Sequence, residues 1–300
     1  MPRATSAGGW SPRLLEAGHR VKVLVRTPQK IADVPWHDQV EIIQDSLSDA
    51  GSLATALTGV DVLYYLVHSM ASGSGFEAKE ESMARLVARA ATDAGVDRIV
   101  YLGGLHPENA ELSIHMRSRE TVGRVFLESA VDSIVFQAGV VIGSGSASFE
   151  MIRHLAETLP VMPAPSWVNN RVEAIAVRDV LHYLVAAAAL PEKLNRSFDV
   201  GSRDVLKYKD MMNEYAVERG LPPAAGGRAS GACSQARGFV GSPGDSHSVV
   251  HVAPLGAVPA TRRGVAGARR RRLHSTARRR PDSLPARRRL GAGQGTGRTG

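Results

Sequence analysis

Between Leu14 and Pro222, short apolar runs rich in β-branched residues alternate with stretches whose apolar residues recur at helical spacing. This alternation is typical of parallel strands joined by crossover helices. Most of the runs are apolar at nearly every position, as strands covered by helices on both faces should be. The sequence therefore predicts an α/β fold with a doubly wound parallel sheet. The predicted strands are Val21–Val25, Val40–Ile43, Val62–Val67, Ile99–Leu102, Ser133–Val141 and Ser197–Val200.

The intervening stretches predict the helices that cover this sheet. Two helical stretches end at a glycine just before a strand, at Gly18 and Gly95. A left-handed residue commonly ends a helix, and glycine adopts that conformation without steric cost. The predicted helices are Ser52–Leu57, Phe76–Ala94, Ser118–Ser129, Ala147–Thr158 and Arg178–Leu190.

The formal net charge of +8 is distributed unevenly along the chain. Residues 224–300 hold 15 Arg against two Asp, a net +13, which leaves −5 for residues 1–223. The tail is rich in Gly, Ala, Ser, Pro and Arg, and it has few large apolar side chains to offset the entropy of ordering. We predict one domain over residues 1–222 and a disordered basic C-terminal tail over residues 223–300.

Composition also bears on partners and compartment. We do not expect a nucleic acid as a partner, because Phe239 is the only aromatic residue of the basic tail available for stacking on bases. No apolar run approaches the roughly 20 residues of a membrane span, and no signal-peptide core follows Met1. Cys233 is the only cysteine, so a reducing compartment is the simplest interpretation. We expect a soluble cytoplasmic protein, and we assign no metal ligands.

Several motifs, in a fixed order, carry a resemblance to a known family. They are Arg13-Leu-Leu-Glu-Ala-Gly-His-Arg-Val, Tyr65-Leu-Val-His-Ser-Met70, Arg98-Ile-Val-Tyr-Leu-Gly-Gly-Leu105, Gln137-Ala-Gly-Val-Val-Ile-Gly and Ile175-Ala-Val-Arg-Asp-Val-Leu-His-Tyr-Leu184. Across about Arg13 to Leu221 the chain resembles the atypical short-chain dehydrogenase/reductases, the NmrA-like relatives of the extended group. The resemblance implies a Rossmann fold that binds NADP or NAD along the carboxyl ends of its strands.

The resemblance also implies which residues contact the cofactor. Arg26 follows the second strand of the family, where a guanidinium would meet the 2′-phosphate of NADP; a solvated surface arginine is the alternative. The family places an Asp-Leu pair near the adenine, and here Ser46 holds the place of the aspartate. His68 and Ser69 would lie beside the nicotinamide ribose; the alternative is that His68 only makes a hydrogen bond at the end of a strand. The full implied set is Arg26, Ser46, Leu47, Val67, His68, Ser69, Leu102, Gly103, Ala138, Gly139 and Val140.

The residues for catalysis depart from the family pattern. Typical members carry a Tyr and a Lys four residues apart on the helix after the fifth strand, and the Lys lowers the pKa of the Tyr. His115 and Arg119 match that spacing here, and residues four apart share one face of a helix. An exposed polar face is the alternative. The fifth strand ends in Gly103-Gly104 where a catalytic serine is expected, so turnover does not follow from the sequence.

The N-terminus lacks the family's first strand and its glycine loop, whose backbone approaches the pyrophosphate. Read one nucleotide earlier, the codons of residues 3–12 are compatible with Thr-Gly-Tyr-Val-Gly-Gly-Arg-Leu-Val-Pro, which is the family's loop. Our hypothesis is that residues 1–12 are an out-of-frame translation. The codons of Gly244–Val249 are also compatible with a shifted reading frame, although the match to the family is looser there. Because the first strand is central, its loss should leave two unpaired strand edges and weaken both stability and cofactor binding.

Two functions from different classes remain open at this point. The first is an NADP-dependent oxidoreductase with an impaired cofactor loop, acting on an unknown small molecule. The second is a non-catalytic NADP-binding redox sensor, since NmrA-like relatives include such proteins. Trp167–Arg171 is predicted to lie near the substrate side, or else to be a packed loop. Fold similarity alone does not choose between the two functions.

Overall fold

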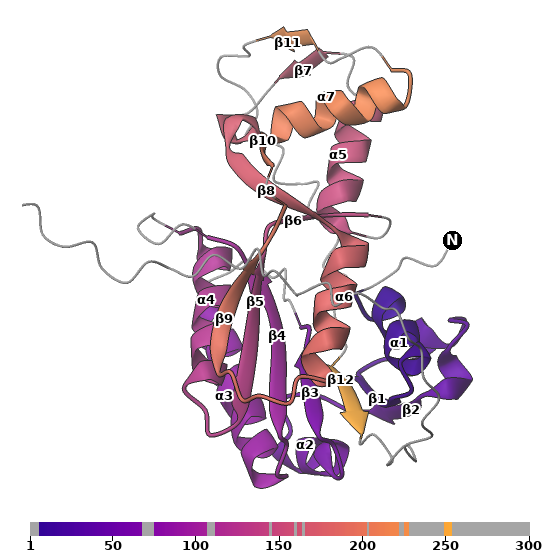
Figure 1. Cartoon of the computed structure of the whole chain (residues 1–300), viewed down its shortest axis with the longest axis vertical. Coiled ribbons are helices and arrows are strands. Elements are labelled where there is room, and N and C mark those ends of the chain that lie inside the picture. The colour runs from indigo at the N-terminus through magenta and orange to yellow at the C-terminus, as the bar shows by residue number, and fades with distance from the viewer. Residues whose placement is uncertain are drawn as a thin grey trace, which may run out of the picture.

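The computed structural model describes residues 6–67, 75–106, 112–143, 146–158, 161–163, 166–202, 204–221, 225–227 and 249–253. Its main layer is a seven-stranded sheet in the order β2-β1-β12-β3-β4-β5-β9 (Figure 1). Neighbouring strands run parallel, except β12, which runs antiparallel to β1 and to β3. The predicted doubly wound α/β fold is therefore confirmed. The strands are β1 (Arg20–Val25), β2 (Glu41–Gln44), β3 (Val62–Tyr65), β4 (Arg98–Gly104), β5 (Asp132–Ala138), β9 (Arg196–Val200) and β12 (Val249–Ala253).

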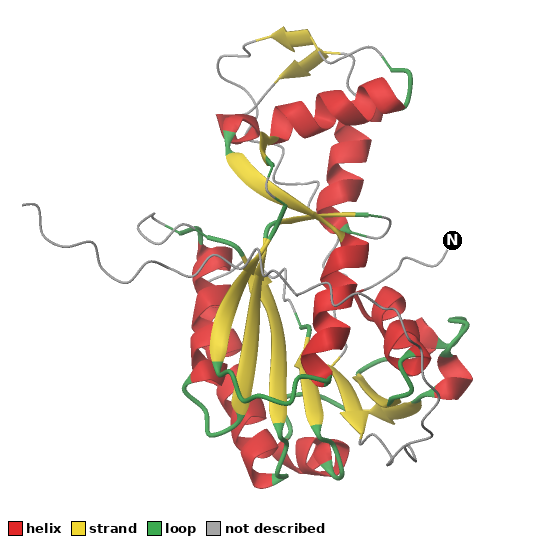
Figure 2. Ribbon diagram, viewed as in Figure 1, coloured by secondary structure: helices red, strands yellow, loops and turns green. Residues whose placement is uncertain are grey.

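Helices cover both faces of this sheet (Figure 2). Helices α1 and α6 pack on one face, and α2, α3 and α4 pack on the other. The predicted helices are found within a few residues of their expected bounds, and Gly18 and Gly95 have the left-handed φ of +86° and +71° that we expected. The bounds are α1 (Ser6–Glu16), α2 (Ala50–Leu57), α3 (Phe76–Asp93), α4 (Ile114–Leu127) and α6 (Val177–Ala188).

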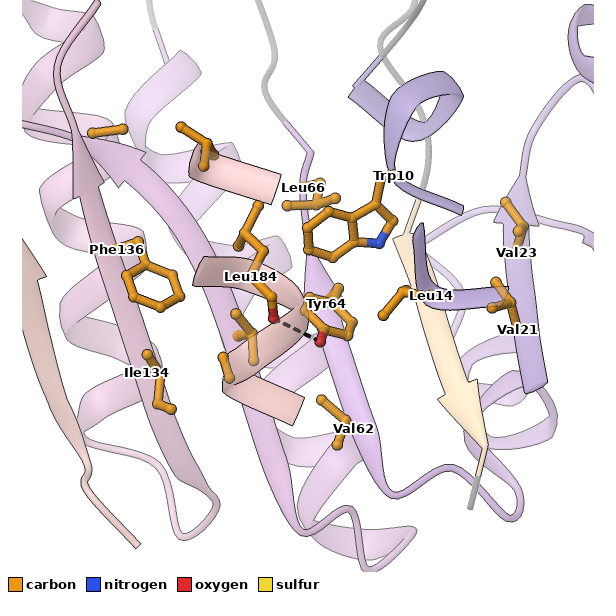
Figure 3. Packing of buried hydrophobic residues seen from close by; sticks show 14 of the residues in the cluster. Trp10, Leu14, Val21, Val23, Val62, Tyr64, Leu66, Ile134, Phe136 and Leu184 are labelled. Atoms are coloured by element: carbon orange, nitrogen blue, oxygen red, sulfur yellow. Dashed lines mark hydrogen bonds between the residues drawn. The ribbon is translucent and has the colours of Figure 1, made fainter. Parts of the chain in front are cut away.

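The core on the α1 and α6 face is built around Trp10 and Tyr64 (Figure 3). Trp10 is 1% exposed, and its ring meets Tyr64 edge-on with the centroids 4.5 Å apart. The Tyr64 hydroxyl donates a hydrogen bond of 3.0 Å to the carbonyl oxygen of Leu184 in α6. This network ties α1 and α6 to the central strand β3, so Trp10 of the N-terminal segment is part of the folded core.

The core on the opposite face is aromatic at its centre. Tyr65 of β3 and Tyr101 of β4 both pack against Phe126 of α4, with ring centroids 5.0 and 5.7 Å apart. Burial raises the pKa of both tyrosines. These phenols therefore hold their protons and act as core residues.

A buried ion pair fixes the amino ends of β4 and β5. Arg98 Nε donates to Asp132 Oδ2 at 2.7 Å, and the other guanidinium nitrogens donate to the carbonyl oxygens of Ala187, Leu190 and Glu192. Asp132 Oδ1 accepts from the backbone N–H groups of Leu194 and Asn195. The pair therefore anchors the segment that leads from α6 into β9.

Strand β12 comes from the segment that the sequence analysis predicted as a tail. It lies between β1 and β3, in the slot that the family's first strand fills, with Val250 aligned to Val23 on one side and to Tyr64 on the other. A Val-Val-His-Val run suits a strand with partners on both sides, and pairing satisfies the edges of β1 and β3 that we expected to be bare. Residues 225–227 also form a strand, β11, and the rest of residues 223–300 lies outside the described residues.

A smaller layer extends from the carboxyl edge of the main sheet (Figure 1). It holds the three-stranded sheet β10-β8-β6, with α5 and α7 packed on a cluster that includes Ile152, Met211 and Met212. Its elements are β6 (Val140–Ile142), α5 (Ala147–Thr158), β7 (Val161–Pro163), η3 (Ser166–Asn169), β8 (Arg171–Ala176), β10 (Val205–Lys207), α7 (Tyr208–Glu218) and β11 (Ala225–Gly227). Two further 3₁₀ turns, η1 (Pro28–Ile31) and η2 (His37–Gln39), lie between β1 and β2. The predicted strand Ser133–Val141 is divided between β5 and β6, and the sequence analysis did not predict β8, β10 or α7.

Candidate cofactor site

The parallel strands β1 to β5 end at one edge of the sheet, and the chain order reverses across β12. From β1 the chain continues outward to β2, whereas from β3 it continues in the other direction to β4 and β5. In open α/β sheets, ligands bind outside the carboxyl ends of the strands where the order reverses. The candidate site therefore lies at the carboxyl ends of β1 and β3, beside Val249, the first residue of β12.

Arg26 and the loop after β2 form one side of this edge. Arg26 is exposed immediately after β1. The Asp45 backbone N–H donates to the Val25 carbonyl oxygen at 3.1 Å, which holds the loop against the end of β1. The Asp45 carboxylate accepts from the Ser46 N–H at 2.7 Å and from the Ser52 hydroxyl. Asp45 is thus used to fix its own turn and the start of α2.

The predicted adenine residues follow Asp45. The Ser46 hydroxyl lies 2.8 Å from the Ser48 hydroxyl, so it is engaged within the loop. Leu47 is partly buried against the core on the α2 and α3 face. Neither side chain repeats the Asp-Leu arrangement of the family, because the extra serine shifts the aspartate to position 45.

The end of β3 is described only as far as Val67. This residue is partly buried against the same core. His68 and Ser69, which the resemblance places beside the nicotinamide ribose, lie outside the described residues. The description resumes at Gly75, whose φ of +89° leads into α3.

Strand β4 ends in two glycines, of which Gly104 lies beside α4. A Cβ placed on Gly104 would lie 2.9 Å from Met116 Cε and 3.3 Å from Arg119 Nη1. A Cβ on Gly103 would lie 3.2 Å from Tyr101 Cε1. Leu102, also predicted to contact the cofactor, packs on the opposite face with α1 and α6. The guanidinium of Arg119 therefore reaches the strand end where the family's serine is expected.

His115 and Arg119, the proposed catalytic pair, contact different parts of the protein. The ring of His115, which is exposed, meets Phe76 of α3 edge-on at a centroid distance of 5.4 Å. Arg119 is half-buried, and its carbonyl oxygen accepts a hydrogen bond of 3.3 Å from the Tyr101 hydroxyl. Of the two residues, Arg119 is the one whose guanidinium lies beside Gly104, with Nη1 3.3 Å from where a Cβ of that glycine would stand. The sequence spacing placed both residues on one helix, but His115 contacts Phe76 of α3 whereas Arg119 lies near the end of β4.

The crossing from β5 to β6 requires glycine at position 139. A Cβ there would lie 1.8 Å from the Glu173 carbonyl oxygen of β8, while the Gly139 N–H donates to the Val200 carbonyl oxygen at 3.3 Å. Ala138 and Val140 are 6% and 7% exposed, and both pack in hydrophobic clusters. Cofactor contacts from this predicted segment would therefore come from its backbone.

The sequence analysis missed two polar residues at this edge, His106 and Gln137. His106 lies two residues beyond β4, and Gln137 is the residue before the last in β5. Their side-chain nitrogens, His106 Nε2 and Gln137 Nε2, lie 3.4 Å apart. The signal was the glutamine itself, which interrupts an apolar run from Ile134 to Ile142.

The place of the glycine loop is taken by a helix. Gly8 and Gly9 lie within α1, which starts at Ser6 and contains Pro12, and residues 1–5 lie outside the described residues. Within the described part of the chain, His, Cys, Asp and Glu side chains do not gather into a group of three that could hold a metal ion. The described helices include none long and apolar enough to cross a membrane.

Comparison with known proteins finds a family model that matches part of this chain. Residues 10–146, from α1 to the loop after β6, match a family model described as NAD(P)H-binding. This match identifies the segment as similar to NAD(P)H-binding domains, and the resemblance to the atypical short-chain dehydrogenase/reductases stays a prediction. No match was found among curated protein sequences. The predicted cofactor class, NADP or NAD, is thus confirmed at the level of the family.

Solved structures share the fold of this chain over 69–75% of its length. The dTDP-glucose 4,6-dehydratase DesIV of Streptomyces venezuelae, crystallised with NAD, is 16% identical with a TM-score of 0.59, covering 74% of this chain and 80% of that one. UDP-N-acetylglucosamine 4-epimerase of Bacillus cereus is 14% identical with a TM-score of 0.57, covering 75% and 84%. Triphenylmethane reductase of Citrobacter sp. is 15% identical with a TM-score of 0.55, covering 69% and 68%.

Proposed function

We propose that the chain binds NADP(H) at the carboxyl ends of β1 to β5 and acts as an oxidoreductase on a small molecule, with weakened cofactor affinity. The observation that carries this proposal is the reversal of chain order across β12 within a domain of the NAD(P)H-binding family. The weakening follows from the N-terminus, because the backbone donors of a glycine loop at the first helix are the usual pyrophosphate site. The single Cys233 fits a reducing, cytoplasmic compartment.

The preference for NADP rests on Arg26. It is exposed directly after β1, at the position from which a guanidinium can contact a 2′-phosphate. An acidic residue at that point would instead favour the ribose hydroxyl of NAD. A charge-assisted hydrogen bond contributes about 1.5–3 kcal/mol, or roughly 10- to 100-fold in affinity.

The proposed proton chemistry rests on Arg119 and His115. Arg119 lies against Gly104, the strand end that faces the nicotinamide in this fold, so its charge could stabilise a developing oxyanion. His115 lies one helical turn earlier and is solvent-accessible, as a residue that exchanges protons with water must be. NADPH would supply the hydride. We place the substrate between this edge and the smaller layer, which carries Trp167–Arg171 on η3 and at the start of β8.

A second function is favoured by the glycines at the end of β4. Without a serine, tyrosine and lysine at the expected positions, a chain that binds NADP(H) could respond to the redox state without turnover. Such a sensor would bind oxidised and reduced cofactor with different affinities and change conformation. It would not consume NADPH with any carbonyl substrate.

Calorimetric titration of NADPH and NADH into the full chain tests the proposal. Arg26→Ala should weaken NADPH binding by about tenfold or more and leave NADH binding unchanged. Arg20→Ala is the matched control, because Arg20 is exposed at the opposite end of the same strand. Equal loss of NADH and NADPH binding in Arg26→Ala would contradict the phosphate role.

Steady-state assays separate the two functions. NADPH oxidation with a panel of aldehydes and ketones, reduced at least tenfold by Arg119→Met, would support the oxidoreductase. NADPH binding without oxidation across the panel would support the sensor. Absence of binding by either cofactor would refute both.

A further inference from the structure

His106 and Gln137 form a polar pair at the carboxyl edge of the sheet that the proposed cofactor chemistry does not use. The Leu105 N–H donates to the Ala138 carbonyl oxygen at 2.8 Å, which fixes the turn after β4 against the end of β5. Gln137 is aligned with Gly103 where β4 pairs with β5, and the whole residue is 9% exposed. With Nε2 of each side chain 3.4 Å apart, the imidazole and the amide are held next to one another.

Each member of this pair has a buried polar atom that lacks a partner. Within the described part of the chain, neither His106 Nδ1 nor Gln137 Oε1 makes a hydrogen bond. Buried polar groups in native proteins nearly always have a partner, and exceptions mark a catalytic role, a bound water or a ligand. Both atoms lie at the edge where this fold binds its ligands.

The chemistry of the missing partner follows from the bond between the two side chains. If the amide nitrogen donates to His106 Nε2, a neutral ring carries its proton on Nδ1, which leaves Nδ1–H as a donor and Gln137 Oε1 as an acceptor. If the amide is turned over, the ring donates from Nε2, which leaves Nδ1 as an acceptor and the amide NH₂ as a donor. In both orientations one of the two partnerless atoms is a donor and the other is an acceptor.

We propose that His106 and Gln137 are a substrate-recognition pair for a neutral group that carries a hydrogen-bond donor and an acceptor on two separate atoms, as a primary carboxamide does. A carboxylate is disfavoured with a neutral ring, because it brings acceptors only and leaves one protein atom without a complement. An ester or tertiary amide fails for the same reason. The proposal deepens the oxidoreductase function and rests on it, since the group recognised would lie beside the carbonyl that is reduced.

Two small β-dicarbonyl probes test the proposal. Acetoacetamide carries a ketone and a primary amide, and N,N-dimethylacetoacetamide carries the same carbonyls without the N–H donors. Binding of each to the full chain is measured at pH 8 by ligand-observed NMR, with and without NADP⁺. The wild-type chain should bind acetoacetamide about tenfold more tightly than its dimethyl analogue.

Substitution of the glutamine should remove this discrimination. Gln137→Met keeps an unbranched side chain of similar length, and it should bring the two affinities within twofold of each other. His106→Phe should do the same while retaining a ring. Gln39→Met is the control, since Gln39 is exposed on η2 and should leave the discrimination intact. Thermal unfolding of each variant confirms that it is folded.

Three results would overturn the proposal. The first is that acetoacetamide does not bind, which would mean that water satisfies the pair. The second is that the wild-type chain binds both probes with equal affinity. The third is that Gln137→Met and His106→Phe still discriminate between the probes. Failure of the cofactor proposal can be told apart from failure of this one. It would appear as absent NADPH binding, whereas the titration of the two probes without cofactor tests the recognition pair by itself.

Discussion

Strand β12 should stabilise the fold, although it comes from a tail that sequence composition marks as disordered. We expect Val250→Pro to destabilise the protein. Val250 is aligned with Val23 and Tyr64, both 0% exposed, so it lies inside the sheet between β1 and β3. Proline removes the backbone N–H, and a carbonyl oxygen of one neighbouring strand then loses its donor.

The magnitude follows from that orphaned carbonyl. Leaving one buried acceptor without a partner costs about 1–3 kcal/mol. For a domain of this size each kcal/mol shifts the midpoint of thermal unfolding by about 2–4 °C, so we expect a decrease of about 2–12 °C. A chain that ends after Ser248 lacks the whole strand and exposes two edges, and it should lose more.

Circular dichroism during heating gives the midpoints, at one salt concentration for all proteins because the tail is highly charged. The matched control is a chain that ends after Pro259, which keeps β12 and should unfold within 1–2 °C of the full chain, as expected for changes away from the core. The reasoning would be refuted if Val250→Pro and the chain ending after Ser248 both unfolded at the same temperature as the parent.

Two further perturbations address the core. Asp132→Ala leaves the Arg98 guanidinium, whose side chain is 8% exposed, without its carboxylate, and it should cost about 3–5 kcal/mol in urea unfolding. Glu81→Ala breaks the exposed pair with Arg85 and should cost less than about 0.5 kcal/mol, so equal costs would contradict this account. Burial lowers the pKa of His19 below the usual 6.5, so the folded chain holds the neutral ring while the unfolded chain takes up a proton. This contribution to stability is complete above pH 6.5 and is lost as the pH falls through the folded pKa. His19→Gln should therefore flatten the decline in the urea midpoint between pH 8 and pH 5.5. A decline as steep as that of the parent chain would refute this role of His19.

The sequence by itself determined the strands of the main sheet other than β12, and the α/β class of the fold. Apolar runs such as Val21–Val25 and Val62–Val67 are local signals of strands covered on both faces, and β1 and β3 are found there. Gly18 and Gly95 marked helix ends through their own backbone freedom. The family motifs also predicted that the cofactor binds at the carboxyl ends of the strands. All of these depend on a residue and its near neighbours in the chain.

Only the tertiary structure decided what fills the central slot and which polar groups meet. Val249–Ala253 becomes a strand because β1 and β3, more than 180 residues earlier in the chain, present unpaired edges to it. His106 and Gln137, and likewise Gly139 and Glu173, come into contact only when β4, β5 and β8 are assembled. Pairing between distant segments is set by complementary hydrogen bonding and exclusion of water in the folded state, and composition or local periodicity does not encode it.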